Sequence, residues 1–248
     1  MIKQLSRLSI IIPAYDEARR ITPTLERITA YLSPLLDDYE VIVIDDGSKD
    51  ETAQIVAGFC ANHPHVHLRQ NVRNRGKGYS VRHGMLWATG NWLLFSDADL
   101  STPIEELERF ASYINEFDVV IGSRGLETSN IVEHQPIYRE WMGRVFNRFV
   151  QRTALAGLAD TQCGFKLFSR ICARDVFSRT TIDGFGFDVE ALYVASALGY
   201  RIAEVPVTWA NDTATKVHPV RDGLRMATDV VKTRWTHRGL TTAADRNR

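Results

Sequence analysis

Several features that define common protein classes are scarce or missing in this chain of 248 residues. Only three cysteines occur, Cys60, Cys163 and Cys172. They show no C-x-x-C spacing and leave one unpaired, which argues against a disulfide scaffold and predicts a reducing compartment. No run of about 18 apolar residues occurs, so no segment is expected to span a membrane. The N-terminal stretch MIKQLSRLSIII has too short an apolar run for a signal peptide.

An excess of charge of either sign is also missing. Lysine and arginine total 30, and aspartate and glutamate total 30. Proteins that bind nucleic acid through their overall charge carry an excess of basic residues, so nucleic acid is not expected as a partner. The length is at the upper end for a single domain, and no linker or internal repeat divides the chain. One domain over residues 1–248 is therefore expected.

Short apolar runs alternate with amphipathic stretches of helical length over the first 121 residues. The sequence predicts buried strands at 8–12, 41–44, 66–68, 92–95 and 118–121, and helices near 16–32, 50–62, 75–89 and 103–115. This alternation is typical of an α/β fold with a mostly parallel sheet and right-handed crossovers. Ligands of such sheets bind outside the carboxyl ends of the strands, so the residues that follow each apolar run are the candidates for a site.

The second half is less regular. Its polar stretch at 122–136 is typical of an active-site loop. Helices are expected at about 138–155, 185–199 and 220–235, and strands within 158–170 and 200–209.

Two carboxylates, Asp97 and Asp99, lie one residue apart where the run at 92–95 ends. An isolated pair of this kind commonly caps a helix, but here the polar turns at 13–17, 45–48 and 122–124 are expected at the same edge of the sheet. Mg²⁺ and Mn²⁺ prefer hard oxygen ligands, take one or two from the protein, and complete their shell with water and substrate phosphates. The pair therefore predicts a divalent metal ion that binds the diphosphate of a nucleotide.

The usual phosphate-binding motifs, G-x-x-x-x-G-K-[ST] and G-x-G-x-x-G, are absent. Asp45 ends the second apolar run, and its carboxylate could accept the ring N–H of uracil or guanine. The following residues, 46–48, have the composition of a turn with a helix cap.

Six motifs occur in the order IIPAYDE, VIVIDDGSKDET, NRGKGYSVRHGM, FSDADLSTP, IGSR and DTQCGFKLF. Together, over about 9–231, they resemble the family 2 glycosyltransferases of GT-A fold, and more narrowly the dolichyl-phosphate β-glucosyltransferases and related polyprenyl-phosphate-sugar synthases. The resemblance implies inverting transfer from a nucleotide sugar. It also implies a Rossmann-like nucleotide-binding half at about 1–121 and an acceptor half at about 122–238. The residues it implies for the nucleotide sugar are Pro13, Tyr15, Glu17, Asp45, Lys77, Asp97 and Lys216, with Asp97 and Asp99 at the metal.

Two acids compete for the role of catalytic base. Asp188 matches the E-D-x-x-L…G-Y segment of the family, with Phe187 in place of the usual glutamate, and Asp160 lies in ADTQCGFK. A lipid monophosphate needs no base, because its second pKa is about 6 and it is already an anion at neutral pH. It needs cations instead, and the resemblance implies that Arg124 and Arg139 bind the acceptor phosphate.

A membrane surface is a further expected partner. The stretch 138–152 carries an apolar stripe at helical spacing with arginines along its flank, and 220–238 repeats the pattern more weakly. A helix that faces the core would show the same stripe, and an interfacial helix would use it to bind lipid. We expect a cytoplasmic protein that docks peripherally on the cytoplasmic face of the membrane.

These patterns lead to one reading with alternatives. The chain is expected to transfer glucose from UDP-glucose to dolichyl or polyprenyl phosphate. Glucose rests on the resemblance of DTQCGFKLF alone, so GDP-mannose or another donor remains an alternative. A glycan or small hydroxyl acceptor is another alternative, and it would require a base. A nucleotidyltransferase would need a glycine-rich basic loop after the first strand, which is missing.

Overall fold

The structure of the protein is a computed structural model, which describes residues 2–133, 136–211 and 219–240. Lys216 lies outside these residues. The seven strands of the main sheet are β1 (Leu8–Ala14), β2 (Tyr39–Asp45), β3 (Val66–Gln70), β4 (Trp92–Ser96), β5 (Val119–Ser123), β7 (Phe165–Ser169) and β8 (Ile202–Pro206). A small second sheet pairs β6 (Asn130–Glu133) with β9 (Thr208–Ala210).

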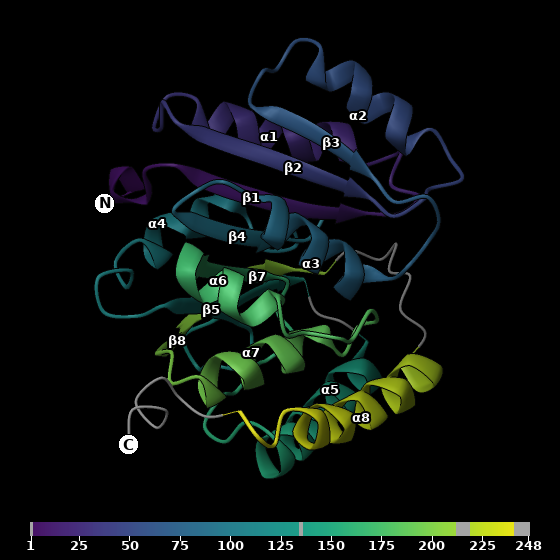
Figure 1. The fold of residues 1–248 in the computed structure, drawn as a ribbon, viewed down its shortest axis with the longest axis vertical. Helices are drawn as coiled ribbons and strands as arrows, with labels where there is room; N and C mark the ends of the chain where they lie inside the picture. The colour runs from purple at the N-terminus through teal and green to yellow at the C-terminus, as the bar shows by residue number, and fades with distance from the viewer. Residues whose placement is uncertain (1, 134–135, 212–218, 241–248) are drawn as a thin grey trace.

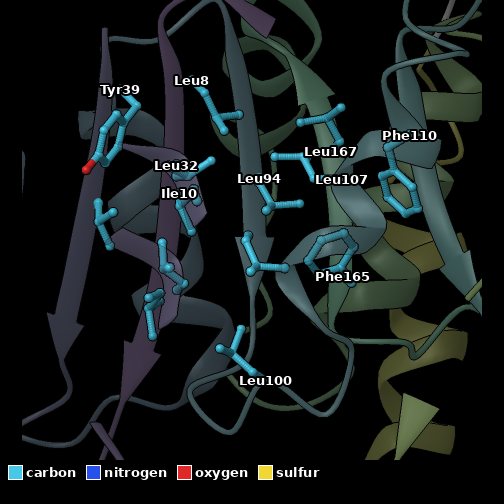
Figure 2. Close-up of a cluster of buried hydrophobic side chains, with 14 of the residues drawn as sticks. Leu8, Ile10, Leu32, Tyr39, Leu94, Leu100, Leu107, Phe110, Phe165 and Leu167 are labelled. Carbon is cyan, nitrogen blue, oxygen red and sulfur yellow. The ribbon is translucent and has the colours of Figure 1, made fainter. Parts of the chain in front are cut away.

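Helices cover both faces of the main sheet (Figure 1). The helices are α1 (Ile21–Leu32), α2 (Thr52–Cys60), α3 (Lys77–Trp87), α4 (Leu107–Phe110), α5 (Ile137–Thr153), α6 (Arg170–Phe177), α7 (Phe187–Ala197) and α8 (Pro219–Thr236), with short 3-10 turns η1 (Ile2–Leu5) and η2 (Ile104–Glu106). Because side chains alternate along a strand, Ile10 and Ile12 of β1 pack in one cluster and Ile11 packs in the other. The first cluster includes α1, α2 and α4, and Figure 2 shows part of it around Ile10, Leu94 and Phe165. The second includes α3, α6 and α7, so the fold has three layers.

The strand order is β3-β2-β1-β4-β7-β5-β8. Parallel pairs join β1 to β2 and β4, β2 to β3, and β5 to β8, whereas β7 runs antiparallel between β4 and β5. The α/β fold with a mostly parallel sheet is thereby confirmed. The carboxyl ends of β1, β2, β4 and β5 and the amino end of β7 meet at one edge, where Asp97 N donates to Gly164 O at 3.1 Å.

The second half differs most from the sequence-based expectation. The expected loop at 122–136 contains β6, and the helix α6 directly after β7 was not expected. The expected strand at 200–209 is two strands, because the chain changes partner at the buried residue Val207. Val207 N donates to Ser123 O of β5, and Val207 O accepts from Asn130 N of β6. The expected helix at 103–115 is reduced to η2 and the single turn of α4, followed by turns.

Among the described residues, no helix is both long enough and apolar enough to cross a lipid bilayer. The helices α5 and α8 pack against each other at one end of the molecule, and α8 also packs on α7 (Figure 1).

Candidate active site

The loops that follow β1 and β2 are tied together at the sheet edge. Asp16 N donates to Ser48 Oγ at 2.9 Å, and Lys49 N donates back to Asp16 Oδ1 at 2.7 Å. Glu17 N donates to Thr52 Oγ1 at 2.7 Å. Three of the predicted nucleotide-sugar residues lie here: Pro13, half-buried near the end of β1, and Tyr15 and Glu17 in the loop after it, the first half-buried and the second buried.

Asp45 lies at the end of β2, opposite Ala14 in the register, and is buried. From the described residues its carboxylate accepts only long hydrogen bonds, both of 3.4 Å and both from Ser48 N. A carboxylate that is so weakly engaged keeps acceptor capacity for a ligand. The structure is therefore compatible with the predicted contact to a nucleotide base.

Asp46 is hydrogen-bonded to residues far outside its own turn. Its carboxylate accepts from Asn71 Nδ2 at 2.7 Å, from Arg75 N at 3.0 Å and from Gly76 N at 2.7 Å. These bonds fix the loop that leads into α3, and therefore the position of Lys77 at the first residue of that helix. The sequence indicated only turn chemistry for Asp46, because its partners lie 25 to 30 residues further along the chain.

The paired carboxylates lie beside two basic side chains. Lys77 Nζ is 2.7 Å from Asp97 Oδ1, and Arg20 Nη1 is 4.0 Å from Asp99 Oδ2. The pKa of Asp99 is raised, mainly by burial and next by the charge of Asp97. A Cβ atom at Gly164 would lie 1.9 Å from Asp97 Oδ2, so only glycine fits beside this carboxylate.

These carboxylates fit a divalent metal ion that is shared with a substrate. No group of three or more histidine, cysteine or acidic side chains that could hold a metal unaided occurs in the part of the chain that the structure describes. Mg²⁺ and Mn²⁺ do not require such a group, because one or two carboxylates suffice when a diphosphate and water supply the remaining oxygens. A cation bound between Asp97 and Asp99 would reduce the repulsion between the two carboxylates.

Charged side chains alternate inward from this edge of the sheet, in the order Asp97, Lys77, Asp188 and Lys166. Lys166 is fully buried, and its Nζ lies 2.5 Å from Asp188 Oδ1 and 2.6 Å from Cys163 O. Burial would lower the pKa of Lys77, but the nearby charges of Asp97 and Asp188 outweigh burial and raise it. Burial raises the pKa of Asp188, and the charges of Lys166 and Lys77 only partly oppose that effect.

The other candidate base, Asp160, is paired with Arg124. Arg124 Nε donates to Asp160 Oδ2 at 2.6 Å, and Arg124 Nη2 donates to Asp160 Oδ1 at 3.0 Å. Burial would raise the pKa of Asp160, but this ion pair and its hydrogen bonds lower the pKa to about 2. A carboxylate with so low a pKa is a weak base, so the geometry favours Asp188 over Asp160 if a base is needed.

A cavity of about 220 Å³ lies on the far side of this ion pair. Among the side chains that line it are Arg124, Arg139, Arg144, Asn147, Asp160 and Trp209. The structure thus brings together the two arginines predicted for an acceptor phosphate and adds a third. Among the described residues, no carboxylate is ion-paired with Arg139 or Arg144, whereas Arg124 is neutralised by Asp160.

One buried pair was not found from the sequence. Glu190 is completely buried and accepts from Thr181 N, from Ile182 N and from the ring of His237 at 2.8 Å. The loop it holds packs on the start of α3, because a Cβ at Gly78 would lie 2.5 Å from Ile182 O. Glu190 therefore connects the end of α8 to the loop that supports Lys77. An acid inside the apolar stretch VEALYVA was the only available signal.

Comparison with known proteins decides the family. The family model described as Glycosyl transferase family 2 matches residues 9–177. The chain belongs to this family and is a glycosyltransferase. Among curated relatives, it is 37% identical to the dolichyl-phosphate beta-glucosyltransferase of Dictyostelium discoideum, over 93% of this chain and 74% of the relative. It is 31% identical to the human protein of the same name, over 91% of this chain and 74% of that protein.

Solved structures agree on the fold of this glycosyltransferase. Mannosyl-3-phosphoglycerate synthase from Rubrobacter xylanophilus superimposes with a TM-score of 0.68 at 19% identity, over 95% of this chain and 74% of that one. Glucosyl-3-phosphoglycerate synthase from Mycobacterium tuberculosis, in complex with Mn²⁺, UDP-glucose and phosphoglyceric acid, gives 0.66 at 18% identity, over 98% of this chain and 83% of that one. These neighbours have the GT-A fold, so the predicted fold is confirmed. The family match and the curated relatives confirm the predicted enzyme class.

Proposed function

We propose that this glycosyltransferase transfers glucose from UDP-glucose to dolichyl phosphate, or to a similar polyprenyl phosphate, with inversion at the anomeric carbon. The observation that carries the proposal is the division of charge across the site. Acids follow β2 and β4 at the edge where a nucleotide sugar would bind, and a cavity lined by three arginines and by the acids Asp160 and Glu140 lies beside them. The curated relatives named dolichyl-phosphate beta-glucosyltransferase support the same sugar and acceptor.

The donor would bind along the edge formed by β1, β2 and β4. Asp45 would accept the ring N–H of the base, and Pro13, Tyr15 and Glu17 would surround the nucleotide. Asp97 and Asp99 would hold Mg²⁺ or Mn²⁺, which neutralises charge on the departing diphosphate when bound. Lys77 is fixed beside Asp97 and would place a second positive charge near the sugar diphosphate. The Mycobacterium tuberculosis neighbour with Mn²⁺ and UDP-glucose supports this arrangement.

The acceptor phosphate would enter the cavity beside Arg139. A lipid monophosphate is an anion at neutral pH, and the planar guanidinium group binds phosphate oxygens in pairs. One phosphate oxygen would attack the anomeric carbon from the face opposite the diphosphate. A new carbon–oxygen bond forms, the bond to UDP breaks, and its electron pair leaves with the diphosphate. Because the attacking oxygen carries no proton, Asp188 would stabilise positive charge at Lys77 and Lys166 rather than act as a base.

A hydroxyl acceptor is the second candidate, and the raised pKa of Asp188 favours it. A hydroxyl group must lose its proton during attack, and a carboxylate with a raised pKa is a better base than an ordinary one. The two candidates therefore differ in whether Asp188 or Arg139 is the more important residue.

We also propose that the protein docks on a membrane surface through α5 and α8. Large apolar side chains are exposed on this helix pair: Trp141 on α5 is 66% exposed, and Leu224 and Trp235 on α8 are 67% and 69% exposed. Arginines flank them, as in interfacial helices that bind anionic lipid. The three cysteines are all free, which fits a reducing compartment and therefore the cytoplasmic face.

The test is a donor and acceptor panel with the purified chain. UDP-[¹⁴C]glucose and GDP-[¹⁴C]mannose are each incubated with Mn²⁺, with or without dolichyl phosphate, and the label in the lipid extract is counted. We expect labelled lipid only with UDP-glucose and dolichyl phosphate together, and none from Asp99→Asn. Label transferred to free-sugar acceptors but not to lipid would overturn the acceptor, and mannose transfer would overturn the donor.

A further inference from the structure

The face of α5 that lines the acceptor cavity has an unusual composition. Arg139, Gly143 and Asn147 follow one another at intervals of four residues, so they lie in one row along the helix, and all three line the cavity. The positive charge of Arg139 accounts for only one end of this row. The other two residues need a separate explanation, because neither carries a charge.

Asn147 presents a buried polar atom that no group satisfies. Its Oδ1 is shielded from solvent, yet it has no hydrogen-bond partner among the described residues. Buried polar groups are nearly always hydrogen-bonded, and one left unsatisfied usually belongs to a place where a ligand or an ion binds. The amide can turn about its terminal torsion and present either its oxygen or its two N–H groups to a ligand in the cavity.

Gly143 lies in the middle of α5, where glycine is less favourable than alanine because it gains no side-chain packing and loses more backbone freedom on folding. Neither backbone nor packing requires it. No described atom lies within 4 Å of a Cβ built at this position, and its φ is not in the left-handed region. By contrast, a Cβ at Gly164 or Gly186 would overlap a carboxylate. What glycine does at position 143 is leave open space beside the cavity.

The volume of the cavity limits which part of a polyprenyl phosphate it can hold. A volume of about 220 Å³ corresponds to roughly seven water molecules at about 30 Å³ each, which is enough for a phosphate and a few carbon atoms. A polyprenyl chain is far too large, so it must leave the cavity beside the phosphate. The exposed side chains of Trp141 and Val145 are each two positions from Gly143, so they lie on the side of α5 that faces away from the row, and they offer an apolar surface there.

We propose that Asn147 and Gly143 adapt α5 to a prenyl phosphate: Asn147 donates its amide N–H to the phosphate that Arg139 binds, and Gly143 is the gap through which the prenyl chain leaves the cavity. The inference rests on the proposed lipid-phosphate acceptor and names two residues that determine its specificity. The two roles differ in chemistry. Asn147 recognises the phosphate whatever is attached to it, whereas Gly143 matters only when a chain is attached.

Gly143 is tested with Gly143→Ala and Gly143→Leu, and Gly58→Ala is the matched control. Gly58 is also an exposed helical glycine without neighbours, and it lies on α2 at the opposite end of the molecule (Figure 1). Both alanine variants should raise the melting temperature by about 2 °C, because alanine favours the helix. Only the changes at position 143 should raise the KM for dolichyl phosphate, by about 3-fold for alanine and 10-fold or more for leucine. The KM for UDP-glucose should stay unchanged. A KM for dolichyl phosphate within twofold of wild type in Gly143→Leu would overturn the role of Gly143.

Asn147 is tested with Asn147→Leu and Asn147→Asp. Leucine has a similar size and removes the unsatisfied oxygen, so the melting temperature should be unchanged or higher while the KM for dolichyl phosphate rises about 10-fold. Aspartate should raise that KM further, because its charge repels the phosphate. An unchanged KM for dolichyl phosphate in Asn147→Asp would overturn the role of Asn147. So would a KM that rises only in variants whose melting temperature falls.

Binding measured by calorimetry separates this inference from the proposed function. Farnesyl phosphate and inorganic phosphate serve as probes, and neither requires turnover. The Asn147 variants should weaken both ligands, and Gly143→Leu should weaken farnesyl phosphate alone. If the wild type forms no lipid-linked glucose but this binding pattern holds, the proposed reaction is wrong and the acceptor site stands. If the wild type makes the product and all variants bind both probes equally, the inference is wrong and the reaction stands. If neither probe binds the wild type, the inference is overturned.

Discussion

Arg124 and Asp160 form a two-pronged ion pair, with Nε to Oδ2 at 2.6 Å and Nη2 to Oδ1 at 3.0 Å. The backbone N–H of Arg124 also donates to Oδ2 at 3.0 Å, so three donors of one residue hold the carboxylate. The guanidinium group cannot offer its full charge to a ligand while it is paired in this way. In the cavity beside this pair, Arg139 and Arg144 have no ion pair with any described carboxylate, and Glu140 also lines the cavity.

The first prediction follows from the pKa of Asp160, which is about 2 in the folded protein and 3.8 in its ordinary state. A lowered pKa contributes stability above the unfolded value, and this contribution disappears as the pH falls from about 4 through 2. It amounts to about 2 kcal/mol at neutral pH. Urea unfolding at pH 7 should show a loss of this order for Asp160→Asn, with a weaker acid dependence below pH 4. The same change at the exposed Asp37 is the control, and equal losses in both variants would contradict the prediction.

The second prediction concerns the metal ion. Asp99→Asn should abolish transfer and leave the fold intact, since the asparagine is neutral and has the same size. EDTA should inactivate the wild type, and Mg²⁺ or Mn²⁺ should restore the wild type only. The control is Glu105→Gln, which removes an acid from an exposed ion pair with Arg27 and should retain activity. Undiminished transfer in EDTA would show that the two carboxylates have another role.

The third prediction concerns the base of the nucleotide. Asp45→Ala should weaken the binding of UDP by about 5- to 150-fold, because an unpaired buried donor costs about 1–3 kcal/mol. Asp45→Asn keeps one acceptor oxygen and should lose less. Calorimetry with UDP measures both, and the KM for the acceptor should not change. Equal affinity for UDP in the alanine variant and the wild type would mean that Asp45 only stabilises the turn after β2 and does not bind the nucleotide.

The fourth prediction separates the two acceptor classes. With a lipid phosphate, Arg139→Ala should reduce kcat/KM for the acceptor by about 10- to 150-fold, and Asp188→Asn should cost less than the roughly 10²–10⁴-fold of a general base. With a hydroxyl acceptor the order is reversed.

The asparagine at position 188 also leaves the buried Lys166 without its counter-charge, so the melting temperature is measured on the same sample. Rates are then compared below the temperature at which that variant unfolds. If Asp188→Asn stays folded and loses more kcat/KM than Arg139→Ala does, the acceptor is a hydroxyl group.

The fifth prediction concerns the membrane. Replacing Trp141 and Trp235 by serine should reduce binding to vesicles with 30% anionic lipid by about 100-fold or more, because burying each large apolar side chain contributes on the order of 2 kcal/mol. Sedimentation with the vesicles measures this. Ile171→Ser is the control, since Ile171 is 73% exposed but lies on α6, away from both helices. If the double tryptophan variant binds vesicles as well as the wild type does, whether or not Ile171→Ser loses binding, the docking surface lies elsewhere.

The sequence predicted the features that depend on local pattern. The apolar runs located β1 to β5, and the rule for the carboxyl ends of strands located the edge where Asp45, Asp97 and Arg124 lie. The short helices and strands of the second half were harder to predict from the sequence. The strand β6 is short and mostly exposed, with only two apolar residues, and α6 begins directly at the end of β7 without a break in the sequence pattern.

Contacts between distant residues could not be predicted at all. The partners of Asp46, the pairing of Arg124 with Asp160 and the burial of Lys166 against Asp188 all join residues at least 22 positions apart. A charged residue can occupy the core only when an opposite charge from another element meets it there, and no local pattern specifies that partner. The Glu190–His237 pair was missed for the same reason.

The position of β7 has a consequence for how the protein is made. The strands β4 and β5 are synthesised first but are joined only through residues 165–169, which the ribosome adds later. Until then, β4 presents an open row of backbone N–H and C=O groups, which is the kind of edge that pairs with other chains. A fragment ending at residue 121 should therefore aggregate rather than fold. The two halves of the chain are expected to bind different ligands, but the centre of the sheet closes only when Ser169 has emerged, so the halves share one folding event.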